Sequence, residues 1–262
     1  MPAAPDSVPP VSQKHFLLDM DGVLVRGREP VPGALDFLAR IEAAGLEYLV
    51  LTNNSEYTPA DLAHRLKSAG FKIDKTRLFT SAMATARFLD NQHPDGKAFV
   101  VGSAGLTTAL HGVDYIITDL EPDYVVLGEG RFDTEAITAA VRHIAAGASF
   151  VVTNPDVAGP TENGIVPAAG SVAALIEAAT GVEPYVVGKP NAFMFRSALN
   201  HLDVHSEDTI MVGDNLRTDI RGGMEAGMET ILVLSGITPR EAVGPSPYRP
   251  THVVESVAEI EV

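Results

Sequence analysis

Short apolar runs alternate along this chain with segments in which apolar residues recur every three or four positions. Runs of the first kind predict strands, and they lie at residues 16–18, 48–51, 209–212 and 231–234. Segments of the second kind predict helices, and they lie at residues 32–45, 58–70, 81–89, 192–202 and 219–226. This alternation is typical of an α/β protein with a mostly parallel sheet.

Local signals mark both ends of the first predicted helix. Pro32 lies where the helix begins, since the first turn has no use for the N–H that proline lacks. Gly45 lies where the helix ends. Within the helix, the apolar positions are Leu35, Leu38 and Ile41.

The middle of the chain repeats the pattern on a smaller scale. A loop of polar and turn-forming residues at 91–96 separates it from what precedes. Strands are then predicted at residues 98–101, 115–117, 124–127 and 150–152, and helices at 105–110, 133–146 and 171–179. This region is therefore expected to be a small α/β unit of its own. The strand predicted at 185–187 resumes the rhythm of the first part.

The overall charge narrows the range of partners. The 262 residues carry a formal net charge of −15, which argues against non-specific binding to nucleic acids or anionic membranes. A phosphate-binding site must therefore be a local exception, supplied with a cation or with aligned N–H groups. The chain has no cysteine, which excludes disulfides, thiolate nucleophiles and cysteine-ligated zinc.

The sequence shows no signal for a membrane or for secretion. No apolar run reaches the roughly 18 residues that a membrane span needs. Residues 1–12 are rich in proline and lack the basic and apolar parts of a signal peptide, so they predict a disordered tail. We therefore expect a cytoplasmic protein, by default rather than from a positive signal.

Four polar clusters each follow one of the predicted strands. They are Asp19 and Asp21; Thr52, Asn53 and Asn54; Lys189; and Asp214, Asn215 and Asp219. If these strands are neighbours in one parallel sheet, the clusters meet at its carboxyl edge, where ligands bind in open α/β sheets. Each cluster alone is a weak signal, because turns and solvated loops contain the same residues. All four together, in this order, make coincidence improbable.

The acidic clusters suit phosphoryl transfer. Asp19 has the chemistry of a nucleophile that forms an aspartyl-phosphate. Asp21 has that of a general acid for the leaving oxygen and then a base for water. Asp214 would join Asp19 in binding Mg²⁺, an ion that prefers oxygen ligands. Asp219 would orient Asp214 or a metal-bound water, and Asn215 is a further candidate support of the metal.

The remaining clusters would bind the phosphate group. The Thr52 hydroxyl and nearby backbone N–H groups, with Asn53 and Asn54, would hold phosphoryl oxygens. Lys189 would neutralise negative charge beside Asp19, because an ammonium group acts as a compact point charge. Positioning and charge compensation are what the loose transition state of phosphoryl transfer requires.

In these motifs the sequence resembles the haloacid dehalogenase superfamily of aspartate-nucleophile phosphohydrolases. Residues 19–23 (DMDGV) are similar to its first motif, 52–54 (TNN) to its second, Lys189 to its third and 213–219 (GDNLRTD) to its fourth. The resemblance implies a Rossmann-like doubly wound core at 13–93 and 186–262, with a smaller α/β cap inserted at 94–185. It also implies Mg²⁺ as cofactor, hydrolysis of a phosphomonoester, and a metal contact from the main-chain carbonyl of Asp21.

Two further segments are similar to the NagD-like branch of that superfamily, which includes nucleotide, phosphoglycolate and pyridoxal-phosphate phosphatases. They are residues 153–156 (TNPD) and 188–190 (GKP). Pyridoxal-phosphate phosphatases of this branch carry a substrate-contacting histidine after the first segment, whereas residues 157–160 here (VAGP) contain none. This departure lowers the expectation of that substrate. Candidate selectivity residues in the loop at 153–169 are Asp156, Thr161, Glu162 and Asn163.

The leading hypothesis is a Mg²⁺-dependent phosphatase for a small phosphomonoester such as a nucleotide, a sugar phosphate or phosphoglycolate. Two other functions stay open: transfer of the phosphoryl group to a sugar, and a phospho-aspartate switch or binding protein similar to receiver domains. Receiver domains have about half this length and no inserted cap, so length favours the enzyme. The sequence leaves the substrate and homo-oligomer formation undecided.

Overall fold

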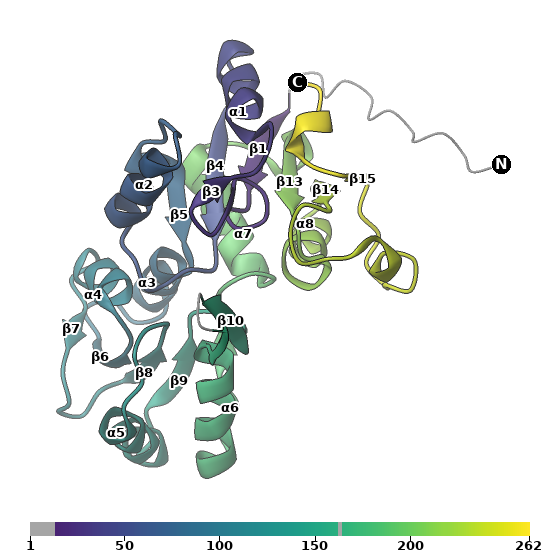
Figure 1. Ribbon diagram of the computed structural model, residues 1–262. Coiled ribbons are helices and arrows are strands. Elements are labelled where there is room, and N and C mark those ends of the chain that lie inside the picture. The colour runs from purple at the N-terminus through teal and green to yellow at the C-terminus, as the bar shows by residue number, and fades with distance from the viewer. Residues whose placement is uncertain (1–13, 162–163) are drawn as a thin grey trace. The chain divides into compact units, whose positions relative to one another are not determined.

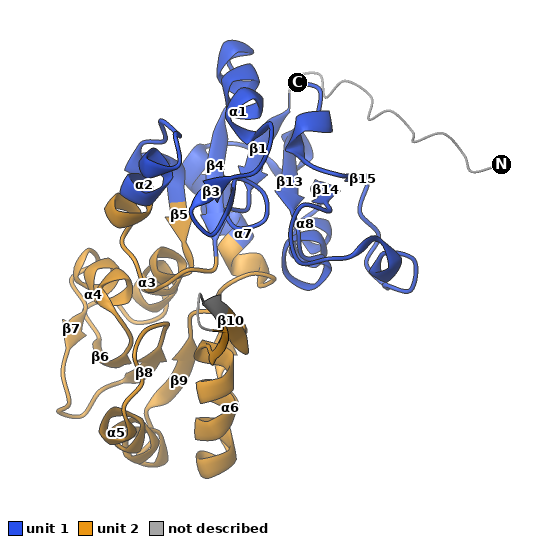
Figure 2. Cartoon of the chain, viewed as in Figure 1, with its two compact units in different colours: residues 1–52, 63–78, 195–262 blue, residues 53–62, 79–194 orange. Residues whose placement is uncertain are grey.

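The computed structural model describes residues 14–161 and 164–262 (Figure 1). The predicted tail at 1–12 and the candidates Glu162 and Asn163 lie outside the described residues. The chain divides into two compact units, with residues 53–62 and 79–194 in unit 2 and the rest in unit 1 (Figure 2). The predicted domain boundaries, after residues 93 and 185, stay a prediction.

A six-stranded sheet with the order β15-β14-β13-β1-β4-β5 organises unit 1. Its strands are β1 (His15–Leu18), β4 (Tyr48–Thr52), β5 (Leu78–Thr80), β13 (Thr209–Gly213), β14 (Glu229–Val233) and β15 (His252–Val254). The pairs from β15 through β4 are parallel. Leu17 pairs with Leu49 on one side and Met211 on the other, and all three are fully buried. Burial on both faces explains why these strands are apolar runs without polar alternation.

The other elements of unit 1 are short. They are the β2–β3 hairpin (Val25–Arg26 and Glu29–Pro30), α1 (Ala34–Ala43), α8 (Arg221–Glu225), a π-helical turn at Leu216–Ile220, and 3-10 turns at Lys75–Arg77, Ser206–Asp208, Arg240–Ala242 and Val257–Glu259. Helices α2 (Pro59–Ser68) and α7 (Ala192–Leu202) each extend across a boundary between the units.

A five-stranded, fully parallel sheet with the order β12-β9-β8-β6-β7 organises unit 2. Its strands are β6 (Lys97–Val101), β7 (Ile116–Ile117), β8 (Tyr124–Leu127), β9 (Ser149–Val152) and β12 (Tyr185–Val186). Its helices are α3 (Ser81–Gln92), α4 (Ala104–His111), α5 (Thr134–Ala145) and α6 (Ala169–Thr180). Val125 and Leu127 point to the same side of β8 and pack with Ile144 of α5 and Ile176 of α6. This packing forms the core of unit 2.

The predicted α/β class with parallel sheets is confirmed, and the strands β2, β3, β5, β10, β11 and β15 were absent from the prediction. A short strand, β5, precedes α3, and the hairpin of β10 (Ala158–Thr161) and β11 (Gly164–Pro167) lies inside the predicted loop at 153–169. The described residues include no helix that is long and apolar enough to span a membrane.

The expectation that the strand before Lys189 shares a sheet with the other three is wrong. Strand β12 pairs in parallel with β9 of the five-stranded sheet, with Tyr185 opposite Val151. The strand has only two residues, and Tyr185 is exposed. So short a run carries no information about its pairing partner, which the surrounding tertiary structure selects.

The buried face of α1 does not include every apolar position of the helix. Ala34, Phe37, Leu38 and Ile41 are buried, whereas Leu35 is 41% exposed. The helix begins at Ala34, and each residue is turned by about 100° from the one before it. Leu35 therefore lies off the stripe that residues 34, 37, 38 and 41 share.

Replacing Phe37 with alanine is expected to lower the free energy of unfolding by about 3–5 kcal/mol, because the fully buried ring leaves a cavity. The ring also loses its edge-to-face contact with Phe16 of β1, at 5.6 Å between centroids. Leu35→Ala, on the same helix, should change stability by less than about 0.5 kcal/mol. Chemical denaturation of both variants measures the difference, and equal effects would contradict this orientation of α1.

Candidate active site

Asp19 and Asp214 meet because their strands are parallel neighbours. Asp19 directly follows β1 and Asp214 directly follows β13, and Leu18 lies opposite Val212 in the pairing. The N–H of Asp19 donates to the Val212 carbonyl at 2.9 Å, which extends the ladder by one residue. Two carboxylates that are far apart in the sequence therefore leave the sheet at the same edge.

A third carboxylate joins this pair. Asp19, Asp214 and Asp219 each place one oxygen so that the three atoms lie within 4.8 Å of one another. Asp214 and Asp219 are buried, and Asp19 is partly exposed. Across residues 14–161 and 164–262, no other three acidic, histidine or cysteine side chains gather this closely. Three hard oxygen donors, two of them buried, suit Mg²⁺ and call for positive charge among them.

The turn after β13 positions Asp219. The Ile220 N–H donates to the Asn215 carbonyl at 3.2 Å, a bond five residues long that makes this turn π-helical. The Asn215 N–H donates to Asp219 Oδ2 at 3.1 Å, and the Asn215 side chain accepts from the Arg217 N–H. The helical segment thus begins before the predicted start at residue 219. Asn215 holds Asp219 through its main chain and the turn through its side chain.

Two glycines leave the space that Asp214 occupies. An added Cβ would lie 2.3 Å from Asp214 Oδ2 at Gly22 and 1.8 Å from it at Gly236. Gly22 also has a φ of +82°, which favours glycine. The Ile237 N–H donates to Asp214 Oδ2 at 2.8 Å. The loops that follow β1 and β14 therefore enclose the Asp214 carboxylate by close backbone approach.

Neither Asp21 nor Thr52 belongs to the group of three carboxylates. The Asp21 side chain is exposed and does not belong to the set of three carboxylates. Thr52 is buried at the end of β4, the strand that pairs with β1 on the side opposite β13. Thr52 thus leaves the sheet at the same edge as Asp19. The catalytic role of Asp21 and the phosphate-binding role of Thr52 stay predictions.

In unit 2, Asn53 binds the main chain of Lys189 at two points. Asn53 Oδ1 accepts from the Lys189 N–H at 2.8 Å, and Asn53 Nδ2 donates to the Lys189 carbonyl at 3.1 Å. The same Nδ2 lies 3.3 Å from Asp156 Oδ2. Lys189 is only 2% exposed. It directly follows Gly188 and is the third residue after β12. The predicted second and third motifs, 136 positions apart, are therefore joined by one side-chain amide.

A set of buried and partly buried hydrogen bonds continues from Asn53. Asn154 Nδ2 donates to the Asn53 carbonyl at 2.9 Å. The Ser55 hydroxyl lies 2.9 Å from the Thr153 hydroxyl, and the Ser55 N–H donates to Glu129 Oε2 at 2.8 Å. We call the set of Asn53, Ser55, Glu129, Thr153, Asn154 and Lys189 the polar network of unit 2. It connects the segments that follow β4, β8, β9 and β12.

Sequence reasoning missed Glu129. Its signal was a single acidic residue in Gly128-Glu129-Gly130, close behind a predicted strand and one residue further from its strand than Asp19 and Asp214 are from theirs. Burial raises the pKa of its carboxyl to about 7, and the charges of Asp156 and Glu56 act in the same direction. The hydrogen bonds from the Ser55 N–H and the Asn154 amide oppose the rise.

The four candidate selectivity residues are described only in part. Asp156 follows β9, and its N–H donates to Asn154 Oδ1 at 3.1 Å. Thr161 ends β10, and Glu162 and Asn163 lie outside the described residues. Asp156 is thus attached to the polar network, by its main chain to Asn154 and by its side chain to Asn53.

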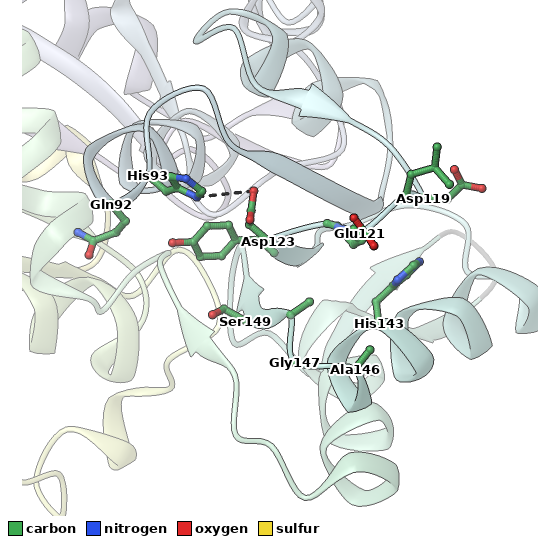
Figure 3. A pocket seen from close by; sticks show the side chains of 13 residues that line it. Gln92, His93, Asp119, Glu121, Asp123, His143, Ala146, Gly147 and Ser149 are labelled. Carbon is green, nitrogen blue, oxygen red and sulfur yellow. Dashed lines mark ion pairs between the residues drawn. The ribbon is translucent and has the colours of Figure 1, made fainter.

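A hollow of about 980 Å³ lies at the amino ends of strands of unit 2, whereas the polar network follows their carboxyl ends (Figure 3). It is lined by residues at the amino ends of β8 and β9, including Asp123 and Ser149, and none of the predicted site residues lines it. His93 Nδ1 lies 3.6 Å from an oxygen of Asp123 in it. We therefore do not assign the reaction to this hollow.

Known proteins share this arrangement. Residues 16–116 match the family described as haloacid dehalogenase-like hydrolase, and residues 186–260 match the one described as HAD-hydrolase-like. The chain belongs to the haloacid dehalogenase-like hydrolases. The predicted family and its NagD-like branch are both confirmed.

The relatives that this chain matches over most of their length are phosphatases. The chain is 54% identical over 246 residues to a dihydroxyacetone phosphatase from Corynebacterium glutamicum, covering 94% of this chain and 90% of the relative. It is 44% identical to the ribonucleotide monophosphatase NagD from Escherichia coli, whose solved structure matches with a TM-score of 0.90 and coverage of 95% and 98%. A glycerol phosphate phosphatase from Mycobacterium tuberculosis, solved with magnesium, matches at 31% identity with a TM-score of 0.90, covering 96% of this chain and 78% of that one. The protein is therefore a phosphatase of this family.

Replacing Gly236 with alanine should displace the Asp214 carboxylate, because the new Cβ would lie 1.8 Å from Oδ2. We expect Mg²⁺ to bind at least about tenfold more weakly, the size of effect seen when the support of a metal ligand is lost. Isothermal titration with Mg²⁺ measures this directly. Gly244→Ala is the matched control, since nothing lies within 4 Å of its Cβ, and unchanged binding in both variants would contradict the arrangement.

Proposed function

We propose that the protein is a Mg²⁺-dependent phosphomonoester hydrolase that acts on a small phosphorylated metabolite through an aspartyl-phosphate. The observation that carries this proposal is the group of Asp19, Asp214 and Asp219 at the carboxyl edge of the six-stranded sheet. The phosphatase activity of relatives that align over more than nine-tenths of the chain supports it.

Asp19 is the nucleophile in this proposal. Its carboxylate oxygen attacks phosphorus, and the bond to the leaving oxygen breaks as the aspartyl-phosphate forms. Asp21 donates a proton to the leaving oxygen and then accepts one from the water that hydrolyses the intermediate. Its exposed side chain, two residues after Asp19, is accessible to solvent for this exchange.

The metal would be held by Asp19, Asp214 and the main chain of Asp21, with Asp219 and Asn215 as supports. The residues fit an oxygen-binding divalent ion, because three carboxylate oxygens converge and backbone glycines make room for one of them. When bound, Mg²⁺ supplies positive charge beside the phosphoryl oxygens. Asp219 is fully buried and accepts a hydrogen bond from the Asn215 N–H. It would therefore keep the group of three carboxylates in place.

Phosphate binding is assigned to Thr52, to the backbone that follows it with Asn53 and Asn54, and to Lys189. A buried lysine supplies local positive charge in a chain of net charge −15, and this compensates the phosphoryl oxygens. Asn53 serves mainly to hold Lys189 in this scheme, since its amide is bonded to the lysine main chain.

The substrate we propose is a small phosphomonoester of a hydroxylated compound, and dihydroxyacetone phosphate is the first to test. The relative with 54% identity is named for that activity, and others are named for ribonucleotides and sugar phosphates. Asp156, attached to the polar network, is the candidate that would accept a hydrogen bond from a substrate hydroxyl.

Asp19→Asn should lower phosphate release by at least about a thousandfold, because an amide is a poor nucleophile and a weaker metal ligand. The measurement is phosphate release with excess Mg²⁺, with circular dichroism to check the fold. Asp36→Asn, an exposed acid in the first turn of α1, is the control and should retain full activity. Metal-dependent turnover by the Asp19 variant would overturn the mechanism.

A panel of phosphomonoesters should show the highest kcat/KM for dihydroxyacetone phosphate or another small hydroxylated phosphate, with activity lost on addition of chelator and restored by Mg²⁺. The panel includes ribonucleoside monophosphates, sugar phosphates, phosphoglycolate and pyridoxal phosphate. Chelator-resistant activity would contradict the proposed metal. Phosphorylated sugar formed from added acceptor would indicate a transferase, and a stable phospho-protein without turnover would indicate a switch.

A further inference from the structure

Glu129 occupies a position that the phosphatase mechanism does not explain. It follows β8 in unit 2 and is only partly exposed, although it is acidic. Ser55 and Glu129 exchange two hydrogen bonds: the Ser55 N–H donates to Glu129 Oε2, and the Glu129 N–H donates to Ser55 Oγ, both at 2.8 Å. Such a reciprocal pair fixes both main chains in one register.

The bonded pair acts on the segment that holds Lys189. Ser55 is two residues after Asn53, and its fully buried side chain also contacts the Thr153 hydroxyl. Asn154, next to Thr153, donates to the Asn53 carbonyl. Asn53 in turn binds both the N–H and the carbonyl of Lys189. Hydrogen bonds, together with the short main-chain steps from Ser55 to Asn53 and from Thr153 to Asn154, therefore connect the Glu129 carboxylate to the Lys189 main chain.

Close packing leaves these hydrogen-bonded segments little freedom to rearrange. A Cβ added to Gly128 would lie 3.1 Å from Ser55 Oγ, and one added to Gly188 would lie 2.8 Å from Asn53 Oδ1. Both of these glycines are buried. A change in the bond between Ser55 and Glu129 is therefore passed to the Asn53 segment rather than absorbed locally.

We propose that Glu129 is a positioning residue: its ionised carboxylate holds Ser55, and through Asn53 it sets the main chain of Lys189 for phosphoryl transfer. The proposal rests on the role of Lys189 in the proposed function. The ionised form is the competent one, because a charged acceptor makes a stronger hydrogen bond with an N–H than a neutral carboxyl does.

The charged groups around Glu129 make its ionisation sensitive to pH near neutrality. Burial, together with the nearby carboxylates of Asp156 and Glu56, raises its pKa to about 7. Tyr57, on the Ser55 segment, Arg131, two residues beyond Glu129, and Lys189 are the other titratable groups on the segments of the network. Protonation below this pKa weakens the bond to Ser55, so turnover should fall as pH decreases through about 7.

Glu129→Gln provides the test, because glutamine keeps the shape and one acceptor oxygen but does not ionise. The ratio of kcat/KM between wild type and variant should rise about tenfold from pH 6 to pH 8, mainly in kcat. The ratio cancels the ionisation of the substrate phosphate and of groups shared by both proteins. A ratio that is independent of pH would overturn the proposal.

Glu56→Gln supplies a second variant that leaves the network bonds intact. Removing this nearby negative charge should lower the pKa of Glu129, so the acidic limb of the rate profile should move to lower pH. Glu135→Gln, an exposed acid in the first turn of α5, is the control and should leave the profile unchanged. An unmoved limb in the Glu56 variant would also contradict the proposal.

Stability gives a readout that does not depend on turnover. A folded-state pKa raised from 4.5 to about 7 means that stability is lost as pH rises through this window, because the folded protein must then bury the charge. Glu129→Gln should therefore gain stability relative to wild type between pH 5 and pH 8. Absence of this trend would show that Glu129 does not titrate there. Wild type without any phosphatase activity would instead refute the proposed function and leave this readout valid.

Discussion

The mutual repulsion of carboxylates at one sheet edge is the constraint on which the rest of unit 1 depends. Parallel pairing of β1 with β13 forces Asp19 and Asp214 to leave the sheet together, and the π-helical turn adds Asp219. Negative charges this close need a cation and firm support. The backbone approach of Gly22 and Gly236, and the N–H groups that bind Asp214 and Asp219, provide that support.

Unit 2, in contrast, contains a buried cation, Lys189, in a chain of negative net charge. Lys189 is nearly inaccessible, and its main chain is held by the Asn53 amide rather than by a regular strand, because β12 ends three residues earlier. The polar network spreads this support over four strand–loop junctions. Its members are buried, except for the partly exposed Asn53 and Glu129, and they are hydrogen-bonded to one another, which avoids the cost of lost hydration.

Family membership narrows the chemistry more than the substrate. Relatives named for dihydroxyacetone phosphate, ribonucleotides and sugar phosphates align with this chain over nearly its whole length. A shared fold and shared motifs therefore coexist with different substrates, which is expected when the reaction resides in one set of residues and selectivity in another. Asp156, which is attached to the polar network, stays a candidate for the second task.

The sequence by itself determined the α/β class, the family and the four motifs, because each motif is a short local pattern behind an apolar run. Helix α7 was predicted at its observed bounds from its spacing. Tertiary structure decided the rest. Pairing partners placed β12 in the second sheet, and packing against β1 selected Phe37 rather than Leu35 for the core. Glu129 acquired its neighbours only when distant segments came together, since Ser55 lies 74 positions away and a local pattern cannot record such a contact.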